Sequence, residues 1–294
     1  MQQIFDLCDC GSLSFLAYPL ESKDVLRVGC DFMNWFFLYD DYSDLMTPHE
    51  AQKLAAIVLD AIRHPDKIRP AHECVVGEAT RQLWNLISQC SSAAARSRLV
   101  KSLEAYTISV VQQAQDRALD YVRDIDEYLP VRRRTIGVKP AFVVLEFCLN
   151  LSDQILEDPI IQRLTNVCVD LIILSNDLYS YNIEQARGDG GHNLVTILIQ
   201  HKHFSLTEAM TWIGNYASKL VHSLLNDLNH IPYFGEEHQA DVERYVNGMG
   251  NWVRANDCWH FESGKYFGMD GLEIQKSRMV ILLPQQWLVP YLQQ

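Results

Sequence analysis

Several features that are scarce or absent in this 294-residue sequence exclude whole classes of protein. Its eight cysteines include no Cys-x-x-Cys pair, and Cys8 and Cys10 are too close together for the usual zinc-site spacing. Basic side chains are also few, 25 against 37 acidic ones, which leaves a formal net charge of -12. The scattered cysteines indicate reduced thiols. Because the negative charge repels phosphodiester backbones and anionic lipid surfaces, we expect neither nucleic acid nor a membrane as partner.

Long apolar runs and targeting signals are missing as well. No segment approaches the ~20 consecutive apolar residues of a membrane-spanning helix. The N-terminal "MQQIFDLCDCGSLSFLAYP" has no positive charge before its short apolar stretch, unlike a secretory signal peptide. The sequence therefore predicts a soluble, cytoplasmic protein, which we expect to be a monomer or a homodimer.

Alternating strand patterns are nearly absent, whereas apolar residues recur at helical spacing along most of the chain. The segments with this spacing are 24–46, 49–63, 73–90, 93–124, 139–150, 158–187, 205–229 and 237–262. Breakers such as "RHPDKIRPAH", "EYLP", "EDP" and "RGDGGHN" separate them without a long linker. Some segments are apolar on more than one face, so we expect an all-α bundle, a single domain over residues 1–294, that encloses an apolar pocket.

An acidic cluster ends the strongly aromatic segment "FMNWFFLYDDYSD". Asp40 and Asp44 are four residues apart and share a helical face, with Phe36 and Phe37 one turn earlier. Three carboxylates within five residues repel one another unless a cation lies between them, and oxygen ligands of this kind suit Mg²⁺. For this motif alone, a solvated acidic helix end is the competing interpretation.

A second polar group lies in "NDLYSYNIE", where Asn176, Ser180 and Glu184 follow one another at intervals of four residues. On a helix they form a stripe of three oxygen ligands with less charge than three aspartates, which leaves room for anionic ligands on a shared cation. Three surface residues in register by chance are the alternative. Together with the aspartate cluster, the stripe indicates a site for several metal ions, and such a site implies a polyanionic ligand, most simply a diphosphate.

Basic residues that could contact a diphosphate occur in two places. "YLPVRRRTIGVKP" supplies Arg132, Arg133 and Arg134 before an expected helix break at Gly137, and guanidinium groups match phosphate geometry. "WHFESGKYFG" supplies a lysine and a tyrosine after an aromatic helix. For either group alone, a solvated basic patch or an aromatic core seam is the commoner interpretation.

Four segments, in order along the chain, resemble those of class I terpene synthases, in particular the fungal, basidiomycete-type sesquiterpene cyclases. "CDFMNWFFLYDDYSD" resembles the aspartate-rich helix of that family, and "YLPVRRRTIGVKP" resembles the segment with its diphosphate-sensing arginine. "NDLYSYNIEQARGDGGHNLVT" resembles the second metal motif and the following loop, and "GNWVRANDCWHFESGKYFG" resembles the terminal segment with an Arg-Tyr pair. The matches extend from about residue 5 to residue 270.

The resemblance implies the α-helical terpenoid (isoprenoid) synthase fold and three Mg²⁺ ions as cofactors. Asp40, with Asp44, would hold two of the ions, and Asn176, Ser180 and Glu184 would hold the third.

The resemblance also implies residues for the diphosphate and the pocket. Counting four residues back from Gly137 makes Arg133 the expected diphosphate sensor, with Arg132 as the runner-up. Lys265 and Tyr266 occupy the positions of the Arg-Tyr pair. The residues expected to line the pocket are Phe36, Phe37, Gly137, Trp252 and Trp259.

The function implied by the resemblance is a Mg²⁺-dependent sesquiterpene synthase that ionises farnesyl diphosphate and cyclises it with release of diphosphate. Two features depart from the family pattern. Lys265 replaces the arginine of the Arg-Tyr pair, and the aspartate cluster begins at residue 40, earlier than in typical relatives, as if part of the usual N-terminal segment were lacking. These departures keep an impaired or non-catalytic diphosphate-binding homologue open as an alternative. A chain-elongating prenyltransferase is disfavoured because the second motif begins with Asn176 rather than an aspartate.

Overall fold

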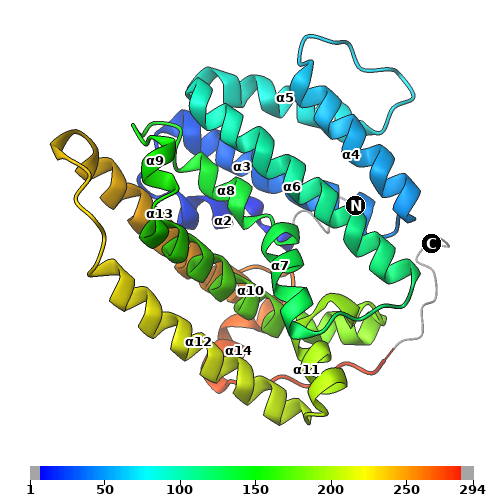
Figure 1. Cartoon of the computed structure of the whole chain (residues 1–294). Helices are drawn as coiled ribbons and strands as arrows, with labels where there is room; N and C mark the ends of the chain where they lie inside the picture. Colours follow the sequence, from blue (N-terminus) through cyan, green and yellow to red (C-terminus); the bar gives the residue numbers. More distant parts are fainter. Residues whose placement is uncertain (1–6, 286–294) are drawn as a thin grey trace.

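The computed structural model describes residues 7–285, and within that range the chain is helical and has no β-strand (Figure 1). The helices are α2 (Cys10–Ala17), α3 (Lys23–Ser43), α4 (Pro48–Arg63), α5 (Val75–Cys90), α6 (Ala93–Ala118), α7 (Ile125–Thr135), α8 (Val138–Val144), α9 (Asp153–Leu156), α10 (Pro159–Arg187), α11 (Leu194–Lys202), α12 (Leu206–Leu228), α13 (Glu236–Glu262) and α14 (Gly271–Ser277). Short 3₁₀ turns lie at Gly190–His192 and Gly268–Asp270. The all-helical expectation is confirmed for the described residues.

The long helices begin where the sequence supplies capping residues. Ser22 accepts a hydrogen bond from the Val25 N–H at the start of α3. Thr47 and Glu50 form a reciprocal capping box at the start of α4, three residues after the acidic cluster ends at Asp44. Asp158 caps α10, whose first residue, Pro159, has no N–H to satisfy. These caps explain why the observed boundaries of α3, α4 and α10 lie within three residues of those expected from periodicity.

The region around "EYLP" differs from expectation. The sequence predicted one helix over 93–124 and a break at Pro130, but α6 ends at Ala118 and Pro130 lies inside α7. Proline removes one helical hydrogen bond, and two other contacts of α7 offset that loss. The Tyr128 hydroxyl donates to Asp177 at 2.5 Å, and the Arg132 guanidinium donates to the same carboxylate.

The core elements place the functional motifs near one another. α10 packs against α7, α11, α12 and α13, so it is central in the bundle (Figure 1). α3 packs against α2, α5 and α8, and its aromatic face contacts α6. Trp35 is held there by a 2.8 Å hydrogen bond from its indole N–H to Thr80. None of the helices within residues 7–285 is both long and apolar enough to span a lipid bilayer.

Candidate active site

The aspartates of the first motif lie at the C-terminal end of α3. The Tyr106 hydroxyl of α6 donates a 2.7 Å hydrogen bond to Asp40 Oδ1. Asp44 caps the helix, and its backbone N–H donates to the Asp40 carbonyl at 2.9 Å. The side chain of Asp44 reaches the surface, whereas Asp40 is half-buried.

The protein raises the pKa of both carboxylates and so disfavours their charged forms. Burial raises the pKa of Asp40, although the hydrogen bond from Tyr106 and the charges of Lys265 and Arg132 work in the opposite direction. Partial loss of hydration, followed by the charge of Asp40, raises the pKa of Asp44 to about 7. Two like charges in this environment favour a cation between them.

The second motif lies on one face of α10, where the four-residue spacing expected from the sequence brings Asn176, Ser180 and Glu184 into register. The Asn176 carbonyl Oδ1 accepts a 2.6 Å hydrogen bond from Arg132, and its Nδ2 donates to His260 Nε2 at 3.3 Å. Burial lowers the pKa of His260 to about 3, so the ring is neutral and its Nε2 accepts. Asn176 is thus oriented from two sides.

Ser180 and Glu184 are joined through one residue outside the stripe, Asn193. Its Nδ2 donates to Ser180 Oγ at 3.3 Å and to Glu184 Oε2 at 2.9 Å. Burial, followed by the charge of Asp177, raises the pKa of Glu184 to about 7. Sequence reasoning missed Asn193, because it follows a glycine-rich turn and has no periodic relation to α10.

Asp177, the residue after Asn176, is a buried junction that the sequence analysis also missed. Its carboxylate accepts hydrogen bonds from the Tyr128 hydroxyl at 2.5 Å, from Arg132 Nη2 at 3.0 Å and from the Leu194 N–H at 3.0 Å. These donors belong to α7 and to the start of α11. A buried carboxylate with several donors ties three helices together.

The structure assigns different surroundings to the adjacent arginines Arg132 and Arg133. Adjacent helical residues point about 100° apart, so only one of them faces the α10 stripe. Arg132 contacts Asn176 and Asp177, whereas Arg133 forms a bidentate ion pair with Asp170, at 2.6 and 2.7 Å. Arg133, four residues before Gly137, thus pairs with Asp170, and the runner-up Arg132 lies beside the stripe; which of them senses diphosphate stays a prediction.

Lys265 lies in an aromatic cage formed by three rings. Its Nζ is 4.1 Å from the centroid of Phe37, 4.9 Å from that of Tyr266 and 5.5 Å from that of Trp259. Burial works against the charge of Lys265, but neighbouring acidic groups, Tyr266 first and Asp40 among them, outweigh it and raise the pKa of the ammonium. The aromatic faces add cation–π attraction.

The two motifs approach each other through these basic residues. Arg132 hydrogen-bonds to Asn176, and its charge, like that of Lys265, opposes the burial that raises the pKa of Asp40. Tyr266, beside Lys265, stacks on His260 with ring centroids 5.2 Å apart and an interplanar angle of 10°. The ends of α3, α7, α10 and α13 thus meet around one polar region.

The residues expected to line the pocket fall into three places. Phe36 lies against Gly137, whose φ of +74° and missing side chain matter, because a Cβ there would approach the Phe36 ring to 3.0 Å. Phe37 and Trp259 face each other at 5.7 Å beside Lys265. Trp252 is separate from both, in the core between Tyr18 and Phe142.

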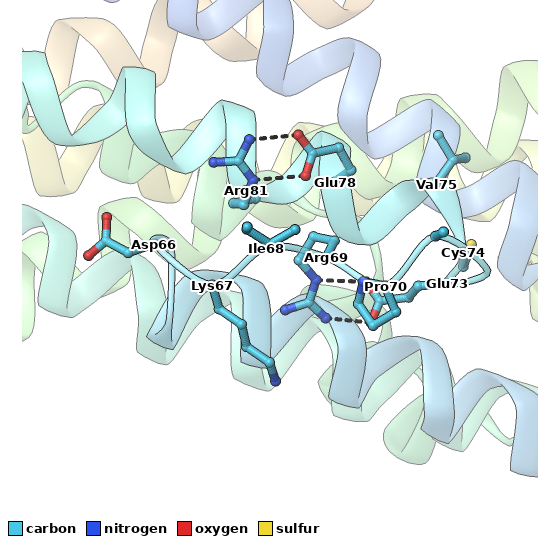
Figure 2. A pocket seen from close by; sticks show the side chains of 11 residues that line it. Asp66, Lys67, Ile68, Arg69, Pro70, Glu73, Cys74, Val75, Glu78 and Arg81 are labelled. Atoms are coloured by element: carbon cyan, nitrogen blue, oxygen red, sulfur yellow. Dashed lines mark hydrogen bonds and ion pairs between the residues drawn. The ribbon is translucent and has the colours of Figure 1, made fainter.

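A pocket of about 570 Å³ lies elsewhere, at the loop between α4 and α5 (Figure 2). Its two arginines are already paired, Arg69 with Glu73 at 2.5 Å and Arg81 with Glu78 at 2.7 Å, and Lys67 also forms an ion pair. The residues that line it include no member of the two oxygen-ligand motifs. We therefore assign this pocket no part in the chemistry.

Comparison with known proteins is consistent with this geometry. Residues 31–223, which include both oxygen-ligand motifs, match the profile of terpene synthase family 2, C-terminal metal binding. The chain belongs to this family. As a terpene synthase it is a lyase, and the family description implies use of a divalent metal.

Fungal sesquiterpene synthases are similar over almost the whole chain. A Delta(6)-protoilludene synthase of Armillaria gallica is 45% identical over 97% of this chain and 82% of its own length. Another from Stereum hirsutum is 43% identical over 97% of this chain and 78% of its own length. Sesquiterpene synthase 14 of Postia placenta is 41% identical over 100% of this chain and 84% of its own length.

Solved structures show that the terpene synthase has the class I isoprenoid synthase fold. The linalool/nerolidol synthase of Streptomyces clavuligerus superposes with a TM-score of 0.78 at 23% identity, covering 88% of this chain and 89% of that one. An α-eudesmol synthase gives a TM-score of 0.78 at 21% identity, with coverage of 89% and 87%. The fold expected from the resemblance is confirmed.

The donor atoms of the terpene synthase fit a divalent metal ion whose coordination shell also holds oxygens from a substrate. Among residues 7–285, no three His, Cys, Asp or Glu side chains form a metal-holding group by themselves. The stripe instead combines one carboxylate with an amide and a hydroxyl oxygen, and the α3 end offers two carboxylates. Such incomplete sets of hard oxygen ligands suit Mg²⁺, which keeps substrate oxygens or water in its shell.

Proposed function

We propose that this terpene synthase ionises farnesyl diphosphate in the presence of Mg²⁺ and cyclises the resulting carbocation to a sesquiterpene. The observation that carries the proposal is the meeting of two oxygen-ligand groups, on α3 and α10, around Arg132 and Lys265. A site with this balance of acids and bases suits a diphosphate bound together with cations.

The α3 and α10 side chains would hold the metal ions. Asp40 and Asp44 supply the ligands at one end, and Asn176, Ser180 and Glu184 supply those at the other. When bound, the ions neutralise charge on the departing diphosphate and so assist cleavage of the allylic C–O bond. We propose three ions because that is the number the resemblance implies.

Arg132 and Lys265 supply the hydrogen-bond donors. The Arg132 guanidinium presents several N–H groups beside Asn176, and the Lys265 ammonium lies within the electrostatic reach of Asp40. Donors placed where negative charge develops stabilise the transition state of ionisation. We assign the sensing role to Arg132 rather than Arg133, since Arg132 borders the α10 stripe at Asn176 whereas Arg133 pairs with Asp170.

The aromatic side chains around the site would stabilise the carbocation. Phe37 and Trp259 already place their faces toward the ammonium of Lys265, and the same faces attract other cations. Phe36, held against Gly137, adds an apolar wall. These rings and the surrounding core keep water away from the cation, so that ring closure competes with hydrolysis.

The test is incubation of the purified protein with farnesyl diphosphate and Mg²⁺, followed by gas chromatography and mass spectrometry of a hexane extract. We expect a cyclic sesquiterpene hydrocarbon or alcohol that disappears when a chelator is added. Diphosphate binding in the presence of Mg²⁺ without any product would contradict the proposal and favour a non-catalytic homologue. A longer prenyl diphosphate formed after addition of isopentenyl diphosphate would instead indicate chain elongation.

A further inference from the structure

Asn193 stands out among the polar residues near α10, because its side-chain amide is fully buried and every polar atom in it is used. It precedes α11, and its Oδ1 accepts a 2.9 Å hydrogen bond from the Val195 N–H, which caps that helix. Its Nδ2 points the other way, toward α10. One end of the amide therefore serves the fold of α11 and the other contacts the stripe.

The Nδ2 group lies among three acceptors on α10. It donates to the Asp177 carbonyl at 2.8 Å, to Glu184 Oε2 at 2.9 Å and to Ser180 Oγ at 3.3 Å. The backbone contact fixes the distance between Asn193 and the helix. The side-chain contacts fix the rotamers of two residues that are one turn apart.

The chemistry of an amide suits this position. A carboxylate that gives one oxygen to a hydrogen bond keeps its second oxygen for a metal ion, and its orientation is then set before the ion arrives. A lysine or arginine in the same place would neutralise Glu184 and compete with the cation, whereas the neutral Nδ2 donor does not. Asn193 thus orients Ser180 and Glu184 without cancelling the charge of Glu184.

We propose that Asn193 is a positioning residue that prearranges Ser180 and Glu184 as metal ligands. The inference rests on the metal-binding part of the proposed function. It goes beyond that function because Asn193 supplies no ligand atom: its Oδ1 is used by the Val195 N–H, and its Nδ2 is a donor to Ser180 and Glu184. Loss of its Nδ2 donor weakens metal binding by more than the loss of an ordinary helix cap can explain.

The experiment compares substitutions that keep the cap of α11 but remove the donor. Asn193→Ser and Asn193→Thr both retain a hydroxyl that can cap the helix, and neither reaches Glu184 as the longer amide does. The probe is Mn²⁺ with inorganic diphosphate, followed by electron paramagnetic resonance. We expect about a 10- to 100-fold weaker Mn²⁺ affinity, the usual effect of removing a hydrogen-bond partner of a metal ligand.

The matched control is Ser205→Ala, which removes a comparable side-chain cap from α12, where Ser205 accepts from the Glu208 N–H at 3.3 Å. Thermal unfolding of each metal-free protein and its circular dichroism are measured in parallel. The control should lower Tm while leaving Mn²⁺ affinity at the wild-type value. The Asn193 variants should lose affinity at a temperature where they are fully folded.

Three results would overturn the inference. Wild-type Mn²⁺ affinity in both Asn193 variants would reduce the residue to a helix cap. Loss of the native circular dichroism spectrum in both would assign it a structural role alone. Absence of Mn²⁺ binding by the wild type would remove the metal site itself, whereas wild-type binding without any hydrocarbon product would refute only the proposed cyclisation.

Discussion

The two halves of the candidate metal site differ in how many hydrogen bonds hold their side chains in place. At the α10 half, Asn176 is held by Arg132 and His260, and Glu184 by Asn193. At the α3 half, Asp40 has a single side-chain hydrogen bond, from Tyr106, and no side-chain donor within residues 7–285 bonds to the Asp44 carboxylate. The α10 side chains are therefore held in place by several protein contacts, whereas the two aspartates have only one such contact between them in the described part of the chain.

This difference separates two ways of losing activity. Substitutions of the α3 aspartates remove charge but break few hydrogen bonds, so they should affect metal binding and leave the free energy of unfolding almost unchanged. Substitutions around α10 break hydrogen bonds that also join helices, so they should reduce activity and stability together. The predictions below test this contrast, beginning with the largest expected effect.

The first prediction concerns the weakly supported half. Asp40→Asn keeps an oxygen that can accept from the Tyr106 hydroxyl but removes the charge. We expect kcat/KM for farnesyl diphosphate to fall by about 10²- to 10³-fold, as when one electrostatic contact to the transition state is lost. The free energy of unfolding, from urea titration, should change by less than about 1 kcal/mol because repulsion with Asp44 is relieved.

The matched control for Asp40 is Asp41→Asn, since Asp41 is the exposed neighbour on another face of α3. It should retain wild-type kcat/KM. A loss of several kcal/mol in the Asp40 variant, or equal loss of activity in both variants, would contradict the contrast between the two halves.

The second prediction compares the adjacent arginines. Arg132→Lys removes the planar fork that joins Asn176 to Asp177, so we expect a loss of about 10²-fold in kcat/KM and of about 1–3 kcal/mol in the free energy of unfolding. Arg133→Lys should cost activity less than about threefold. The reverse order of activities, measured by product formation, would restore Arg133 as the diphosphate contact.

The third prediction concerns the aromatic cage. Lys265→Met keeps the length of the side chain and removes the ammonium that lies over Phe37 and Trp259. We expect inorganic diphosphate to inhibit the Mg²⁺-loaded enzyme about 10-fold less strongly, which corresponds to a modest charge-assisted contact. Lys265→Arg should restore part of the inhibition. Unchanged inhibition in Lys265→Met would confine the lysine to a packing role.

The fourth and smallest prediction concerns the break between α7 and α8. Gly137→Ala places a methyl group against the Phe36 ring. The backbone φ there is +74°, a value that residues with a side chain rarely adopt. We expect the free energy of unfolding to fall by about 1–2 kcal/mol. Gly188→Ala is the control for the backbone effect, because its φ is +80° but nothing lies within 4 Å of its Cβ position. Equal losses would show that contact with Phe36 contributes little.

The sequence predicted the parts of this arrangement that depend on local periodicity. The registers of Asp40 with Asp44 and of Asn176 with Ser180 and Glu184 follow from helical spacing alone, and the all-helical fold follows from the same pattern. Whether these residues bind metal stays a prediction.

What the sequence could not supply is contact between distant segments. Whether Arg132 or Arg133 reaches the Asn176 stripe of α10 depends on how α7 is rotated, and a shift of one residue changes the face by about 100°. Asn193 and Asp177 gain their importance from hydrogen bonds across helices, which periodicity does not reveal. Pro130 stays helical for the same reason, because Tyr128 and Arg132 attach α7 to Asp177.

The shared carboxylate of Asp177 has a practical consequence for protein engineering. Its donors are Tyr128, Arg132 and the Leu194 N–H, which span residues 128–194. This stretch should therefore be exchanged between proteins as a whole. A chimera of two related synthases with a crossover inside the block would combine a carboxylate from one parent with donors from the other. Crossovers outside residues 128–194 should give folded hybrids more often, because they leave Asp177 and its donors from the same parent.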